Sequence, residues 1–194
     1  MREIEIKILE INRAAVEQRL LALNAKKTFD GLLHAVFFDF STGNIRKKKD
    51  VLRLRKQGDR TFLTYKKFIS NTKTKSREEI ETEVASFEQT RDILLALGLH
   101  PTLEMKKRRI SYALGKLHCE FDRYEDEYGF IPEFLEIEGT TSKSVFALAK
   151  KLGFSKKDCK AWSANDLARH YRKLSKGFWA TYEMNSQKGF LRER

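Results

Sequence analysis

Apolar and polar residues alternate along eight segments of the chain, which is the period of a β-strand whose two faces have different surroundings. These segments cover residues 2–9, 33–41, 50–57, 60–68, 76–84, 102–114, 116–124 and 131–139. Gly58 and Gly115 lie in short turn sequences between neighbouring segments, so those neighbours are expected to form antiparallel hairpins. The pattern favours a β-meander or a barrel.

Helical periodicity replaces this alternation in three windows, residues 12–23, 86–97 and 142–152. Asn12 and Ser86 are suitable N-cap residues, and Gly98 and Gly153 stand where a left-handed residue commonly ends a helix. These windows are therefore expected to be helices.

A further helical pattern covers residues 166–174, and a basic, aromatic tail follows it. We expect one domain over residues 1–174 and a separate tail over residues 175–194. The basic run 45–50 lies between two predicted strands and is interpreted as a solvated loop.

Charge narrows the class of partner. The chain has 194 residues and a net charge of +12, from 39 Lys and Arg against 27 Asp and Glu. Nucleic acid, phosphate-rich small molecules and acidic membrane surfaces are the partners that this charge favours.

The cysteines and the hydropathy of the chain indicate in which cellular compartment the protein is expected. Cys119 and Cys159 have no metal-ligand spacing and form no disulfide framework. No apolar stretch approaches the ~18 residues needed to span a bilayer. A cytoplasmic protein without a membrane segment is expected.

The polar faces of the predicted strands are unusually rich in charged side chains. Pairs of carboxylates two residues apart occur on several strands, and Arg53 and Arg55 form such a basic pair on another. For any single strand, a polar face exposed to solvent would explain these charges. Several strands together indicate a ligand, because like charges at this spacing repel unless counter-ions separate them.

Closing the eight strands into a barrel would place these charged faces inside and the apolar faces under the helices. The expected fold class is therefore α+β, mainly β: an eight-stranded antiparallel closed barrel with helices packed outside. Carboxylates that hold a hard cation such as Mg²⁺, beside basic side chains that hold phosphate oxygens, indicate a site for polyphosphate chemistry.

Six motifs in order resemble those of the CYTH family, the triphosphate tunnel metalloenzymes, which include class IV adenylate cyclases, thiamine triphosphatases and tripolyphosphatases. The first is Glu3-Ile4-Glu5-Ile6-Lys7, similar to the Glu-x-Glu-x-Lys signature of the family. The others are Leu52-Arg53-Leu54-Arg55, Thr64-Tyr65-Lys66, Arg77-Glu78-Glu79-Ile80-Glu81, Lys107-Arg108-Arg109 and Phe134-Leu135-Glu136-Ile137-Glu138.

The resemblance implies a tunnel that binds a triphosphate with Mg²⁺ or Mn²⁺, and it implies a role for each matched residue. The metal ligands would be Glu3, Glu5, Asp122, Glu136 and Glu138. The phosphate chain would be held by Lys7, Arg53, Arg55, Lys66, Lys107 and Arg109. Catalytic roles would belong to Glu5, Lys66 and Glu81.

Some positions depart from the family pattern or leave alternatives open. Ala35 stands where the family often has a polar residue, and the register of residues 106–109 is open by one residue. Glu79, Glu83, Glu120 and Arg77 fit structural ion pairing as well as they fit the site.

The expected function is metal-dependent hydrolysis of tripolyphosphate or of a nucleoside or organic triphosphate. A class IV adenylate cyclase that makes cyclic AMP and pyrophosphate from ATP needs the same ligands and remains the nearest alternative. A non-enzymatic RNA-binding or polyphosphate-binding module is a third. The expected partner is a triphosphate-containing small molecule, rather than nucleic acid or a membrane, and a homodimer is left open.

Overall fold

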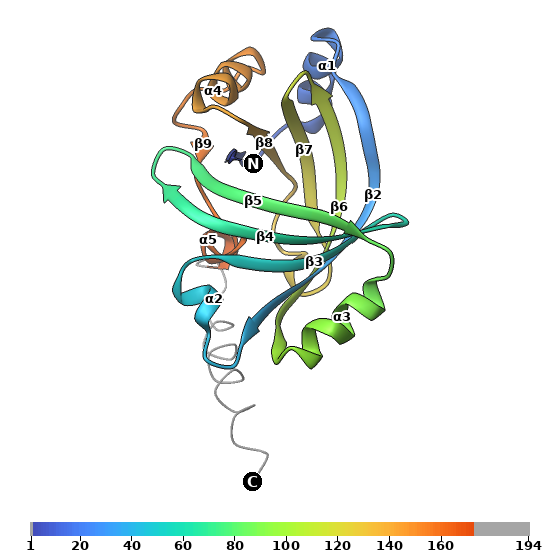
Figure 1. Ribbon diagram of the computed structural model, residues 1–194. Helices are drawn as coiled ribbons and strands as arrows, with labels where there is room; N and C mark the ends of the chain where they lie inside the picture. The colour runs from blue at the N-terminus through green and yellow to red at the C-terminus, as the bar shows by residue number, and fades with distance from the viewer. Residues whose placement is uncertain (1, 173–194) are drawn as a thin grey trace. The chain divides into compact units, whose positions relative to one another are not determined.

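The computed structural model describes residues 2–172, and its main feature is a closed antiparallel barrel (Figure 1). The barrel strands, in chain order, are β1 (Arg2–Ile8), β2 (Lys26–Phe40), β3 (Val51–Gln57), β4 (Arg60–Asn71), β5 (Lys75–Val84), β6 (Leu99–Leu114), β7 (Leu117–Tyr124) and β8 (Phe134–Gly139). They follow the spatial order β5-β4-β3-β2-β6-β7-β8-β1, and pairing of β5 with β1 closes the ring. The predicted fold class is confirmed.

A short ninth strand, β9 (Cys159–Lys160), pairs with the end of β1, where Lys7 and Ile8 lie opposite its two residues. The sequence does not predict this strand, because two residues are too few to show a period.

Several strand boundaries differ from the prediction. β2 begins at Lys26 rather than near residue 33, because it pairs with β6 along nearly its whole length. Its first half contains lysines, Asp30 and Gly31, which break the alternation. β8 begins at Phe134 rather than at residue 131, since Pro132 and a single 3-10 turn (Asp126–Tyr128) occupy the connection before it.

The three expected helices are present as α1 (Arg13–Ala22), α3 (Phe87–Ala96) and α4 (Ser142–Lys151). The side chains of Asn12, Ser86 and Thr141 accept hydrogen bonds from backbone N–H groups of the first turn of the helix that each precedes. The residues after the helices include Gly98 at φ 81° and Gly153 at φ 88°, in the left-handed region as expected.

One helix, α2 (Asn44–Lys47), lies where a solvated loop was expected. Its turn is held by buried Asp39, whose carboxylate accepts hydrogen bonds from the backbone N–H groups of Ile45 and Arg46, each at 2.9 Å. Asp39 precedes Ile45 and Arg46 by six and seven residues, so the basic run 45–50 does not by itself predict the helix.

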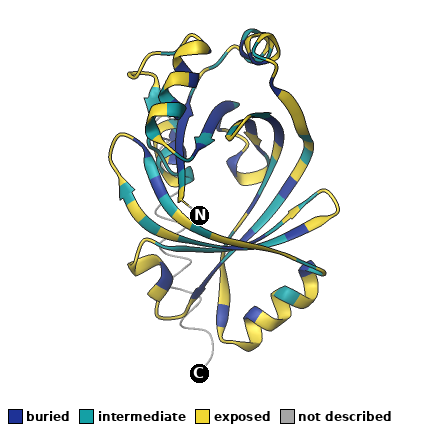
Figure 2. Ribbon diagram, turned by 45° about the horizontal axis from the view of Figure 1, so that its top comes forward, coloured by how far each residue is buried: buried dark blue, intermediate teal, exposed yellow. Residues whose placement is uncertain are grey.

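Two apolar clusters cover the outside of the barrel. α1 and α4 pack over the outward faces of β1, β6, β7 and β8, and Ile6, Leu20 and Leu152 are fully buried there. A second cluster joins α3 and Ile45 of α2 to β2 and β3. The apolar faces of the strands therefore point outward, which leaves the polar faces to line the interior. Figure 2 shows how buried, intermediate and exposed residues are distributed along the strands and helices.

Residues 1–161 form one compact unit, and a second begins at Trp162 and contains α5 (Ala164–Arg172). The predicted tail over residues 175–194 lies outside the described residues, and the predicted boundary at residue 174 stays a prediction. Among the residues that the structure describes, no helix has both the length and the apolar character needed to cross a membrane.

Candidate active site

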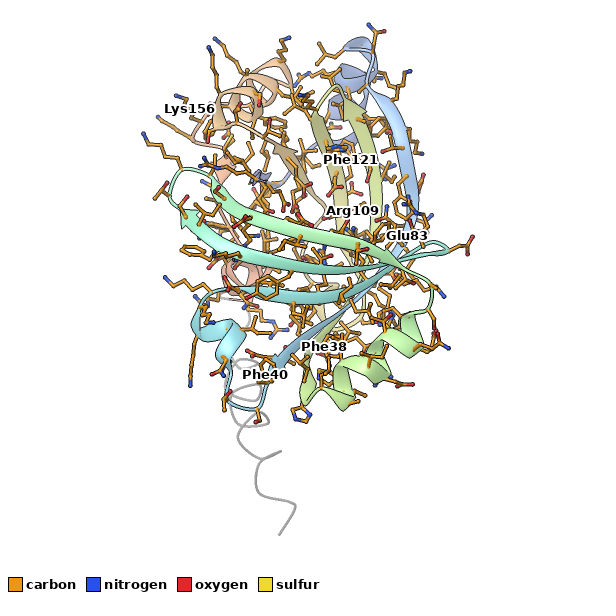
Figure 3. All side chains as sticks on the ribbon, in the orientation of Figure 1. Phe38, Phe40, Glu83, Arg109, Phe121 and Lys156 are labelled. Atoms are coloured by element: carbon orange, nitrogen blue, oxygen red, sulfur yellow. The ribbon has the colours of Figure 1, made fainter. Side chains whose placement is uncertain are left out.

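Acidic and basic side chains project from the inward faces of the strands into the barrel. In β1, Glu3, Glu5 and Lys7 point inward, while the isoleucines between them are buried on the outer side. The pairing register sets Glu5 opposite Glu138 and Lys7 opposite Glu136 on the neighbouring strand. Figure 3 shows Arg109 within the ring of strands and Glu83 at its rim.

Two groups of carboxylates on β1, β7 and β8 could each hold a metal ion. The first contains Glu3, Glu5 and Glu138, and the second contains Glu120, Glu136 and Glu138. Within each group, one oxygen from every carboxylate lies within 4.8 Å of the others. Glu138 belongs to both groups, so it links them.

The electrostatics of Glu138 fit a cation. Burial, and then the nearby carboxylates of Glu120, Glu3 and Glu136, raise the pKa of Glu138 well above its ordinary value. Burial likewise raises the pKa of Glu120, against the influence of Arg109. A divalent cation would stabilise the ionised form of these clustered oxygens, and oxygen donors of this kind suit Mg²⁺ and Mn²⁺. The residues therefore fit the metal that the resemblance implies.

Other carboxylates of the site are compensated by lysines. Glu5 is bound by Lys7 at 2.8 Å and by Lys75 at 2.6 Å, and Lys7 also contacts Glu136. Burial opposes ionisation of Glu5, but Lys7 and Lys75 outweigh it and lower the pKa of Glu5. Lys66 Nζ lies 2.7 Å from a carboxylate oxygen of Glu3, where it outweighs burial and lowers the pKa of that carboxyl.

Asp122 has a different environment from the glutamates. Its side chain is fully buried, and its two oxygens accept hydrogen bonds from Arg109 at 2.6 Å and from Lys107 at 2.5 Å. These two cations outweigh burial and lower the pKa of Asp122. Asp122 belongs to neither carboxylate group, so its predicted metal-binding role stays a prediction.

The side chains on β3 and β4 form a basic wall of the interior. Arg53 and Arg55 lie two residues apart, and both approach Glu81, at 3.7 Å and 3.3 Å. Burial, and then Arg53, lower the pKa of Arg55 to about 10. Arg55 therefore stays charged at neutral pH beside a like charge, an arrangement that an anion would stabilise.

These two arginines retain donors for a ligand. Within the described part of the chain, the buried Nε atoms of Arg53 and Arg55 have no hydrogen-bond partner. An unpaired buried donor is costly, so two of them on one wall indicate a bound acceptor. Glu81 accepts a hydrogen bond from Thr64 at 2.7 Å and lies beside both guanidinium groups, where it can orient them.

Some members of the site were missed or left open by the sequence analysis. Glu120 is part of the second carboxylate group, although ion pairing explained it equally well from the sequence. Lys75 contacts Glu5, and its place directly before the predicted strand 76–84 concealed it. Glu83 pairs with Arg60 at 2.6 Å on the exposed rim, which fits the ion-pairing interpretation.

In β6, the residues that face the barrel interior are the ones that the sequence analysis selected. Lys107 and Arg109 both contact Asp122 inside the barrel, whereas Lys106 and Arg108 are paired with exposed acids. Ala35 faces Arg55 across the β2–β3 ladder and supplies no polar group.

Comparison with known proteins gives the family. The CYTH domain profile matches residues 1–171. A protein of Methanocaldococcus jannaschii that is provisionally named an adenylate cyclase is 28% identical over 142 residues, covering 73% of this chain and 79% of the relative.

Solved structures agree in fold. A protein from Pyrococcus horikoshii is 26% identical with a TM-score of 0.70, covering 85% of this chain and 98% of its own. A Hippeastrum protein, provisionally named an adenylyl cyclase and described as having a dominant triphosphatase activity, is 19% identical with a TM-score of 0.57, covering 94% of this chain and 96% of its own. The profile match over residues 1–171 and the interior charges together place the chain in the CYTH family.

Proposed function

We propose that this protein is a divalent-metal-dependent enzyme that hydrolyses tripolyphosphate or a nucleoside or organic triphosphate inside the barrel. One observation carries the proposal. The interior holds two carboxylate groups that share Glu138, together with Arg53 and Arg55, whose buried Nε donors lack partners among the described residues. This combination suits a metal ion and a phosphate chain bound side by side.

The carboxylates would hold the metal. Glu3, Glu5 and Glu138 would contribute to one site, and Glu120, Glu136 and Glu138 to another. Bound Mg²⁺ or Mn²⁺ would neutralise charge on the phosphate oxygens and activate water. Lys7 and Lys75 keep Glu5 ionised and in place for this role.

The basic wall would bind and orient the phosphates. Arg53 and Arg55 can each donate to a phosphate oxygen without giving up a hydrogen bond at Nε. Lys66 and Lys107, at the partly exposed edges of their ion pairs, would add charge along the chain. We assign Lys7 and Arg109 a supporting part, because buried carboxylates already surround them.

Positioning and electrostatic stabilisation would supply most of the rate. Glu81 would hold the two guanidinium groups in place through its contacts with Arg55 and Thr64. Closure of the barrel limits water around the reacting phosphate and so strengthens each charged contact.

Class IV adenylate cyclase activity is the second candidate. The 28% identical relative from Methanocaldococcus jannaschii, provisionally named an adenylate cyclase, favours it. Attack by the 3′-hydroxyl of ATP on the α-phosphate would use the same metal and phosphate ligands and would release pyrophosphate.

A substrate panel tests the proposal. Tripolyphosphate, ATP and thiamine triphosphate are incubated with the protein and Mg²⁺ or Mn²⁺, and the products are resolved as phosphate, pyrophosphate or cyclic nucleotide. Release of phosphate that stops with EDTA supports the hydrolase. Cyclic AMP with pyrophosphate supports the cyclase, and no turnover of any triphosphate with either metal overturns both.

We place this activity in the reducing cytoplasm. Both cysteines are free, and Cys119 is fully buried, where burial raises the pKa of its thiol to about 12 and keeps it unreactive.

A further inference from the structure

The formal charges of the side chains inside the barrel cancel. The inward basic side chains are matched one for one by the inward acidic side chains. The basic ones are Lys7, Arg53, Arg55, Lys66, Lys75, Arg77, Lys107 and Arg109, and the acidic ones are Glu3, Glu5, Glu79, Glu81, Glu120, Asp122, Glu136 and Glu138. The net charge of +12 therefore belongs to the rest of the chain.

One region of the outer surface concentrates this excess. Between residues 141 and 160 the only acidic residue is Asp158. The same segment contains six lysines, which we call the α4 lysine face: Lys143, Lys150, Lys151, Lys156, Lys157 and Lys160. The Asp158 carboxylate is hydrogen-bonded within the segment, because it accepts from the backbone N–H and the hydroxyl of Ser155 at 2.7 and 2.8 Å.

These lysines are available to a ligand. All except Lys160 are exposed, and none forms an ion pair with a carboxylate of the described residues. Lys143, Lys150 and Lys151 share one stripe of α4 with the small residue Ala147, and Lys143 and Lys150 lie about 10 Å apart along the helix axis. A hydrogen bond between Thr74 and Ser142, at 3.2 Å, brings exposed Lys73 of the β4–β5 turn close to the start of α4.

An aromatic ring lies among the lysines. Phe146 is half-buried on α4, one turn from Lys143 and one turn from Lys150. Lys156 Nζ lies over this ring, 5.8 Å from its centroid. Part of the ring packs against the apolar cluster beneath α4, and its exposed part, beside the lysines, offers a stacking surface for a base.

We propose that the α4 lysine face binds single-stranded nucleic acid, with lysines on the phosphates and Phe146 beneath a base. Among the described residues, the large exposed apolar side chains all lie outside residues 141–161, so this face has no apolar anchor for a lipid surface. This site is on the outside of the barrel and is independent of the proposed triphosphate chemistry.

A pair of charge-reversal variants tests the proposal. Lys143→Glu with Lys150→Glu alters the face, and Lys47→Glu with Lys48→Glu makes the same change in net charge on two exposed residues at the C-terminal end of α2. Binding of labelled single-stranded RNA to the full chain is measured by fluorescence anisotropy in EDTA over a series of salt concentrations. Equal melting temperatures show that both variants fold, and Lys143→Gln with Lys150→Gln serves if they do not.

The expected result is a loss of at least about tenfold in RNA affinity, and a fall of about two in the salt slope, for the α4 variant only. Triphosphate turnover should be unchanged, which separates this site from the barrel. Equal weakening in the α2 variant would show a general charge effect and overturn the proposal. Absence of RNA binding, competition by tripolyphosphate, or binding of anionic vesicles in preference to RNA would also overturn it.

Discussion

At the scale of single residues, acidic side chains that look alike in the sequence have opposite roles in the barrel. Asp122 is enclosed by Arg109 and Lys107, which outweigh burial and lower its pKa, whereas burial, and then the neighbouring carboxylates, raise the pKa of Glu138. Glu5 lies between two lysines. Substitutions that remove one charge from each environment should therefore separate metal binding from folding.

We expect Glu138→Gln to lower turnover by at least about a hundredfold and to raise the melting temperature in EDTA. The amide removes a metal ligand, but it also removes an ionisable group that the fold favours only when protonated. Activity assays with Mn²⁺ and thermal melts in EDTA test this together.

Glu5→Gln is the matched control for this pair of effects. It should also abolish turnover, but it should lower the melting temperature, because Lys7 and Lys75 lose their shared anion. Full activity of either variant at saturating Mn²⁺ would contradict the assigned metal sites.

Arg55→Ala should raise the KM for a triphosphate by about ten- to a hundredfold, the equivalent of one or more charged hydrogen bonds. Its effect on the melting temperature should be small, since its ion pair with Glu81 is long at 3.3 Å. Arg60→Ala, which removes an exposed ion pair with Glu83, is the control and should change neither quantity. A loss of stability without a change in KM would assign Arg55 to ion pairing alone.

At the scale of elements, α2 shows how a short helix depends on a tertiary contact. The Asp39 carboxylate accepts hydrogen bonds from the N–H groups of Phe40, Ile45 and Arg46, at 2.8 to 2.9 Å. A helix of four residues has too few internal hydrogen bonds to persist alone, so this buried acceptor stabilises it.

Asp39→Ala should therefore lower the free energy of unfolding by about 1–3 kcal/mol, because buried donors lose their acceptor. Triphosphate turnover at a temperature where the variant is folded should stay close to that of the unaltered protein. Denaturant unfolding measures the first quantity and a steady-state assay the second. An unchanged unfolding midpoint would show that α2 does not depend on this carboxylate.

At the scale of the whole molecule, the interior charges make stability depend on pH and metal together. Burial and the hydrogen bond with Glu3 raise the pKa of Glu79 to about 7, and the pKa of Glu138 is also raised. A carboxyl with a raised folded pKa stabilises the fold below its unfolded pKa, and this contribution is lost as pH rises through the folded value. The lowered pKa values of Glu3, Glu5 and Asp122 act in the opposite sense, but only in acid.

In EDTA, the melting temperature should therefore fall between about pH 5 and about pH 8, since the carboxyls with raised pKa values lose their protons there. Mn²⁺ should raise the melting temperature more at the higher pH, because it competes with protons for the same oxygens. Thermal melts at both pH values, with and without Mn²⁺, measure this. A metal effect that is equal at the two pH values, or larger in acid, would contradict it.

The sequence by itself determined the secondary structure that has a period, and with it which face of each strand is charged. Alternation in Glu3-Ile4-Glu5-Ile6-Lys7 is enough to separate two faces, because side chains on a strand point to opposite sides in turn. The helix caps at Asn12 and Ser86 were equally local, and the order of the motifs indicated the family.

Only the tertiary structure decided which charges meet, because those contacts join positions far apart in the chain. Lys75 reaches Glu5 across 70 residues, and Asp39 forms α2 through bonds that no local pattern predicts. The closed sheet also matched the inward acids to the inward bases and so left the surplus positive charge to the rest of the chain. A sequence supplies the number of charges, but their balance in any one place depends on how the strands are paired.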